Sequence, residues 1–152
     1  MSALNIMLVD DNQNLVTTLS LGLRKAMGKA ISVAVCFSGS DALAMLRTQR
    51  FDVVISEFNI PGVSGLELLN KIRQDYRKTI LVLVTSYGTD ALEEEAHRLG
   101  IGYVTKPFEP THLVQTIHDL MRGKEKTDRT ENAPRNLIPD PMGNEGLDDW
   151  RM

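Results

Sequence analysis

Five polar residues that follow short apolar runs could together form a site for phosphate and a metal ion. Asp10 and Asp11 come directly after the first apolar run, Glu57 closes the third, Thr85 closes the fourth, and Lys106 follows the fifth. Carboxylates are ligands that hard cations such as Mg²⁺ prefer, while an ammonium and a hydroxyl can hold phosphoryl oxygens. Each feature is ordinary by itself, as a solvated loop, a strand residue or a turn. Their joint occurrence at the ends of successive runs points to phosphate chemistry.

Converging carboxylates need a positive charge, because two unit charges ~4 Å apart repel by about 4 kcal/mol at an effective dielectric constant of about 20. Lys106 supplies one positive charge, and a divalent cation would supply the rest. We therefore expect Mg²⁺ at this site, bound directly by Asp11 and Glu57. Asp10 would bind it through water, and the backbone carbonyl of Asn59 would complete the ligands.

The elements that position these residues follow from the apolar runs, which alternate with segments of helical period. The runs are Ile6–Val9, Ile31–Phe37, Val53–Ile55, Ile80–Val84 and Tyr103–Val104. Because continuous apolar strands need cover on both faces, they indicate a parallel sheet with helices on each side. We predict an α/β fold, a (βα)5 doubly wound sandwich around a central five-stranded parallel sheet. Ligands of such sheets bind beyond the carboxyl ends of the strands.

Helix signals agree with this order of elements. A leucine recurs every four residues from Leu15 to Leu23, and Ser64–Glu67 has the pattern of a capping box. Thr89 is suited to cap the following helix. Pro110 fits the first turn of the last helix, which we expect over residues 110–122.

Composition excludes several classes of protein. A net charge of -3 with a pI near 5.6, and no basic run, argue against binding to nucleic acid. The single cysteine, Cys36, excludes an internal disulfide and fits a reducing compartment. No stretch approaches the roughly 20 apolar residues of a membrane span, and the amino terminus lacks a secretion signal. The expected location is cytoplasmic, without membrane contact.

Composition also predicts a domain boundary at about Gly123. Residues 1–122 form the expected folded domain, and residues 123–152 read as a polar tail with prolines, glycines and few apolar side chains. Two interpretations of the tail stay open: a solvated terminus, or a docking peptide anchored by Trp150.

From about residue 4 to residue 122, the sequence resembles the receiver domain of bacterial two-component response regulators. That resemblance implies the flavodoxin-like form of the (βα)5 sandwich. The matching motifs arrive in the family's order, and Pro107 matches a position that the family uses for a cis proline. They are Val9–Asp11, the segment 51–65 with Pro61-Gly62 and Gly65, Thr85-Ser86, Tyr103, and Lys106–Phe108.

The resemblance implies a role for each matched residue. Asp10 and Asp11 look like the metal-binding acidic pair, and Lys106 looks like the lysine that contacts the phosphoryl group. Thr85 looks like the switch hydroxyl, and Tyr103 like the switch aromatic that reorients when the phosphoryl group is present.

Glu57 departs from the family, because it occupies the position of the phosphoacceptor Asp. The extra methylene moves the carboxylate by about 1 Å or more, and a misplacement of that size can cost about 10²-fold in rate. Our hypothesis is that Glu57 partly imitates the modified state, by accepting a hydrogen bond from Thr85 or pairing with Lys106 without phosphorylation. Ser56 is not a good substitute acceptor, since strand alternation points it to the other face.

Three functions remain as alternatives. The preferred one is a stand-alone receiver domain, not an enzyme beyond self-phosphorylation and self-dephosphorylation, that signals without phosphorylation. Its expected partner is a histidine kinase or other signalling protein bound through residues 89–122, the face that could also form a homodimer. The alternative is a competent phosphoacceptor or relay intermediate that uses Mg²⁺. An unrelated flavodoxin-like enzyme or nucleotide binder fits less well, because no Gly-rich loop follows the first strand.

Overall fold

A computed structural model describes residues 3–131, apart from the side chains of Lys29 and of residues 125–131. Five parallel strands form one sheet in the order β2-β1-β3-β4-β5. The strands are β1 (Leu4–Val9), β2 (Ile31–Cys36), β3 (Val53–Glu57), β4 (Ile80–Thr85) and β5 (Gly102–Thr105). This sheet confirms the predicted doubly wound, flavodoxin-like fold. β1 lies at the point where the strand order reverses, between β2 and β3.

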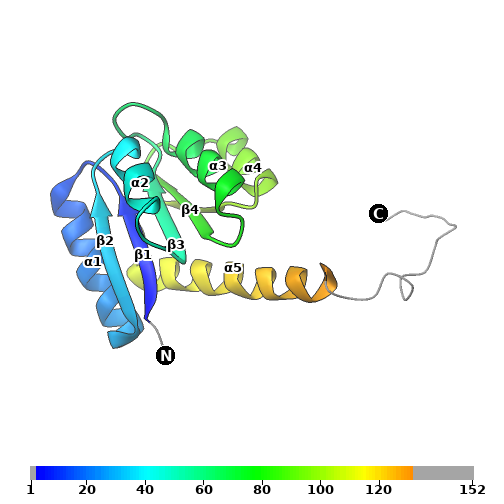
Figure 1. Ribbon diagram of the computed structural model, residues 1–152. Coiled ribbons are helices and arrows are strands. Elements are labelled where there is room, and N and C mark those ends of the chain that lie inside the picture. Colours follow the sequence, from blue (N-terminus) through cyan, green and yellow to red (C-terminus); the bar gives the residue numbers. More distant parts are fainter. Residues whose placement is uncertain (1–2, 132–152) are drawn as a thin grey trace, which may run out of the picture. The chain divides into compact units, whose positions relative to one another are not determined.

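Helices cover both faces of the sheet (Figure 1). α2 (Gly39–Leu46), α3 (Gly65–Asp75) and α4 (Asp90–Arg98) lie on one face, whereas α1 (Gln13–Met27) and residues 110–121 of α5 (Pro110–Glu131) lie on the other. A short 3₁₀ helix, Gly28–Ala30, joins α1 to β2.

Alternate strand residues feed two separate hydrophobic clusters. On β1, Met7 packs with α2 and α3, and its neighbour Leu8 packs with α1 and α5. The first four residues of β3 and all of β4 are buried, which explains why these strands read as continuous apolar runs. The sheet is therefore the rigid part of the fold, and the side chains at its carboxyl edge are held by it.

The predicted helix starts are confirmed. Ser64 accepts a hydrogen bond from the amide of Glu67 at 3.1 Å, and Thr89 accepts one from the amide of Leu92 at 3.1 Å. α5 begins at Pro110, as expected from its fixed φ angle. Lys106-Pro107 is a cis peptide bond.

The last helix ends later than expected. α5 continues to Glu131, although the sequence suggested an end at residue 122. Residues 124–126 are Lys-Glu-Lys, which are good helix formers, and the next proline comes only at Pro134. The chain divides into two units, with the boundary between Met121 and Arg122. The proposed anchor Trp150 lies outside the described residues. Within the described range, no helix is long and apolar enough to cross a membrane.

Two leucines of α1 test how the cluster under α1 and α5 stabilises the fold. Leu23 is 0% exposed and Leu21 is 64% exposed, although they lie two residues apart on one helix. Leu23→Ala should lower the free energy of unfolding by about 3 kcal/mol, because it leaves a cavity between α1 and the sheet. Leu21→Ala should change it by less than about 0.5 kcal/mol. Urea unfolding of both variants measures this, and equal losses would contradict the described packing.

Candidate functional site

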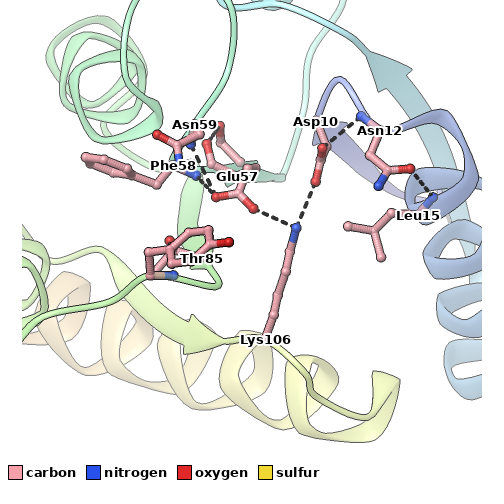
Figure 2. Close-up of polar contacts among 10 residues, drawn as sticks. Asp10, Asn12, Leu15, Glu57, Phe58, Asn59, Thr85 and Lys106 are labelled. Atoms are coloured by element: carbon pink, nitrogen blue, oxygen red, sulfur yellow. Dashed lines mark hydrogen bonds and ion pairs between the residues drawn. The ribbon is translucent and has the colours of Figure 1, made fainter.

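Glu57 is the last residue of β3, and its carboxylate points into the space beyond the carboxyl edge of the sheet (Figure 2). Its side chain is only 10% exposed. One oxygen, Oε2, accepts hydrogen bonds from the backbone amides of Phe58 at 2.6 Å and Asn59 at 3.2 Å. The other, Oε1, lies 2.6 Å from the ammonium nitrogen of Lys106. Both oxygens of the carboxylate therefore have protein partners.

Lys106 bridges two carboxylates that come from different strands. Its Nζ lies 3.1 Å from Oδ2 of Asp10, which follows β1, in addition to its contact with Glu57 at the end of β3. Figure 2 shows the lysine side chain reaching between the two acidic groups. The second oxygen of Asp10 accepts a hydrogen bond from the amide of Asn12 at 3.0 Å. The bridge ties β1 and β3 to the loop after β5.

The environment of Lys106 favours its charged form. Burial alone would lower the pKa of this lysine, but hydrogen bonds and charges from Glu57 and Asp10 outweigh it and raise the pKa above its ordinary value. The side chain is 17% exposed, so water screens these contacts only partly. The ammonium is thus the counterion of the two carboxylates.

Asp11 does not join this cluster. It is exposed, unlike its neighbour Asp10, which is 7% exposed. No group of three or more His, Cys, Asp or Glu residues in the described part of the chain is arranged to hold a metal ion. In this arrangement Lys106 contacts two of the predicted ligands, Asp10 and Glu57, and the Mg²⁺ ligand set stays a prediction. Asn59 contributes its amide to Glu57, and a role for its carbonyl stays a prediction.

Thr85 lies close to the site but has a different partner. It ends β4, is 0% exposed, and its hydroxyl accepts a hydrogen bond from the amide of Tyr87 at 3.1 Å. Among the hydrogen bonds of the described residues, none joins Thr85 to Glu57. Of the two contacts that the sequence suggested for Glu57, the structure contains the one with Lys106.

Tyr103 lies half-buried on β5 and packs against the cluster under α3 and α4. Its hydroxyl occupies the space above Gly88, where a Cβ atom would lie 1.8 Å from it. Burial, with the negative charges of Glu93 and Asp90, raises the pKa of Tyr103, and a hydrogen bond with the backbone of Thr89 opposes this. The aromatic ring is thus seated beside the start of α4.

Sequence reasoning missed how two residues position the site: Asn12, which it did not name, and Gly65, which it named only as a matching motif. Asn12 caps α1 by accepting from the amide of Leu15 at 3.1 Å, and its own amide holds Asp10. At Gly65, a Cβ would lie 2.0 Å from the carbonyl oxygen of Glu57. This approach brings the start of α3 against the end of β3. The Asp-x-Asn spacing before a helix is a recognisable signal for the cap, whereas the approach at Gly65 has no signal beyond the glycine itself.

A family model for the response regulator receiver domain matches residues 6–118. The chain belongs to this family. Receiver domains are signalling modules of two-component systems, and they bind kinases and other signalling proteins. Binding of Mg²⁺ at the phosphorylation site is a general property of the family.

Similar proteins include two mycobacterial regulators. The probable transcriptional regulatory protein TcrX of Mycobacterium tuberculosis is 33% identical over 120 residues, which cover 77% of this chain and 49% of that protein. The DNA-binding response regulator MtrA of Mycolicibacterium smegmatis is 31% identical over 133 residues, covering 88% and 54%. The chain thus spans about half the length of these relatives. Given the name of the second, the absence of nucleic-acid binding by this chain stays a prediction.

Solved receiver structures share the fold. The chemotaxis response regulator CheY4 of Vibrio cholerae has a TM-score of 0.68 and 28% identity, covering 78% of this chain and 99% of that one. The BeF3-activated DrrB receiver domain has a TM-score of 0.69 and 26% identity, covering 79% and 98%.

Removal of the lysine should expose how much the bridge contributes. Lys106→Met leaves Asp10 and Glu57 without a counterion, so the free energy of unfolding should fall by about 2 kcal/mol in metal-free buffer. Adding Glu57→Gln to this variant should restore part of the loss, because one uncompensated charge disappears. Urea unfolding of the single and double variants measures the coupling. Strictly additive effects would show that the contact contributes nothing.

Proposed function

We propose that this chain is a receiver module of two-component signalling in which Glu57 takes the phosphoacceptor position and makes phosphorylation unnecessary. The observation that carries the proposal is the 2.6 Å contact between Oε1 of Glu57 and Nζ of Lys106. In the family, the matching lysine contacts the phosphoryl group. Here an unmodified carboxylate supplies the negative charge that this lysine would otherwise receive only after phosphorylation.

The hydrogen bonds of Glu57 also disfavour it as a nucleophile. An attacking carboxylate oxygen must be free to approach phosphorus in line with the leaving group. Oε2 is held by two backbone amides and Oε1 by the lysine, so either oxygen must lose a contact before it can react. The longer side chain thereby stabilises its own unmodified form.

Glu57 imitates the phosphorylated state only in part, through its contact with Lys106. The Thr85 hydroxyl accepts from Tyr87 and has no contact with Glu57 among the described hydrogen bonds. Tyr103 is nevertheless seated over Gly88, beside α4. We infer that the carboxylate fixes Lys106, while the position of Tyr103 is maintained by its own packing.

The proposed interaction surface consists of α4, β5 and the start of α5, within residues 89–122. Its exposed groups include the acidic side chains of Asp90, Glu93 and Glu94 on α4. A histidine kinase or another signalling protein with a basic contact surface suits this face. A second copy of the chain could occupy it as well, through contacts that pair the acidic residues with exposed lysines or arginines.

Incubation with acetyl phosphate and Mg²⁺, followed by intact-mass measurement, tests the central part of the proposal. The wild-type chain should gain no phosphoryl group. Glu57→Asp shortens the side chain by one methylene and should restore a stoichiometric adduct. A stoichiometric adduct on Glu57 of the wild type would overturn the proposal and favour the competing function of a phosphoacceptor, for which Asp10 and Lys106 are in place. An inert Glu57→Asp variant would show that the site has a further defect.

Gly88 provides a test of the switch residue. Gly88→Ala should displace the side chain of Tyr103, because the new methyl group overlaps the phenol oxygen. Nitration by tetranitromethane, mapped by peptide mass, should then increase several-fold at Tyr103. Tyr87, which is 81% exposed, is the internal reference in the same sample. Gly123→Ala is the matched control, since a Cβ there meets nothing within 4 Å. Unchanged nitration of Tyr103 in the Gly88 variant would contradict the described packing.

A further inference from the structure

A second charged feature lies at the opposite edge of the sheet from Glu57. The loops α2–β3 and α3–β4 border an open cleft of about 780 Å³, lined by residues 46–52 and 75–79. These loops lead into the amino ends of β3 and β4, whereas Glu57 lies at the carboxyl end of β3. At about 3.3 Å per strand residue, the cleft and Glu57 are separated by roughly 15 Å. A ligand in the cleft would therefore leave the Lys106 site accessible.

The cleft is basic in a chain that is acidic overall. Arg47, Arg50, Arg77 and Lys78 line it, against two carboxylates, so four positive and two negative charges give the lining a net charge of +2. The whole chain carries -3. All four cations are exposed, and those at positions 47, 50 and 78 take part in none of the ion pairs formed within the described range.

Helix dipoles explain only part of this charge. Arg47 is the C-cap of α2, where a positive charge is favourable beside the last carbonyls. Arg50 and Lys78 lie in the connecting loops, beyond the last turns of α2 and α3. Since the dipole effect falls off within one turn, these two cations have no structural role of that kind.

The walls of the cleft are held in place by hydrogen bonds. The Tyr76 hydroxyl donates to the carbonyl of Leu46 at 3.2 Å, and the Thr79 hydroxyl donates to the carbonyl of Phe51 at 3.2 Å. These bonds connect one loop to the other. Arg73 adds bonds from its guanidinium to the carbonyls of Arg77 and Thr79, at 3.2 and 3.3 Å. The cleft is thus preformed, which lowers the entropy cost of binding.

We propose that this cleft binds an acidic peptide segment of a partner protein. Glutamate or aspartate side chains would pair with Arg50 and Lys78, and an apolar side chain would lie on Tyr76, which is half-buried. A peptide suits the mixed lining better than nucleic acid does, since its amides can donate to Asp52 and Asp75. The phosphates of a nucleic-acid backbone have no hydrogen-bond donors to offer those two carboxylates. The inference does not depend on the state of Glu57.

An NMR titration of the full ¹⁵N-labelled chain tests this proposal, with a short synthetic peptide of alternating glutamate and leucine as the probe. Saturable shifts should appear in the amides of residues 46–52 and 75–79. Arg50→Glu with Lys78→Glu should weaken binding by about tenfold or more, because two attractive contacts become repulsive. The control is Lys25→Glu with Lys71→Glu, which makes the same change in net charge at exposed positions outside the cleft, and it should bind like the wild type.

Three outcomes would overturn the proposal: no saturable shifts, shifts centred elsewhere on the molecule, or equal weakening in both double variants. A single-stranded oligonucleotide that shifts the same amides more strongly than the peptide would reassign the cleft to nucleic acid. Glu57→Asp should bind the peptide like the wild type. A failure of peptide binding in the cleft is therefore distinguishable from a failure of the proposed role of Glu57.

Discussion

The ammonium of Lys106 is the interaction on which the site depends, because it is the positive charge that lets Asp10 and Glu57 lie close together away from water. Its two contacts, of 2.6 and 3.1 Å, join the ends of β1 and β3 to the loop that follows β5. Three segments that are remote in sequence are thereby fixed by one side chain. Breaking this bridge leaves buried negative charge, which costs more than the bridge gains when formed.

The parallel sheet makes this bridge possible. β1 and β3 are direct neighbours, so residues that follow them come together at one edge, where Lys106 can reach both. The amide of Lys106 also donates to the carbonyl of Thr85 at 2.9 Å, which fixes its backbone beside β4. On the opposite edge the same topology gathers loops rich in arginine and lysine. The carboxylates bound by Lys106 and the basic cleft therefore lie at opposite ends of the strands.

The apolar runs, alternating with segments of helical period, were enough to predict the strands and their parallel arrangement. The polar residues that follow these runs were enough to predict the convergence of Asp10, Glu57 and Lys106. It was not enough to predict which oxygen meets which donor. Asp10 and Asp11 are adjacent and chemically equal in sequence, yet a one-residue step separates a buried carboxylate from an exposed one. Thr85 was placed correctly, but its bond to Tyr87 depends on the loop after β4, which carries no periodic signal. The position of the Tyr103 hydroxyl against Gly88 likewise arises only from packing between segments, which the sequence does not show.

The rate at which the Lys106 ammonium exchanges protons with water tests most directly whether Glu57 holds this lysine without metal or phosphorylation. In ¹⁵N-lysine-labelled protein without metal or phosphodonor, its side-chain signal should be visible and exchange with water more slowly than that of the exposed Lys71. Glu57→Gln should remove much of this protection, since the charged partner is lost. Exchange of Lys106 as fast as that of Lys71 in the wild type would contradict a standing bond between the lysine and Glu57.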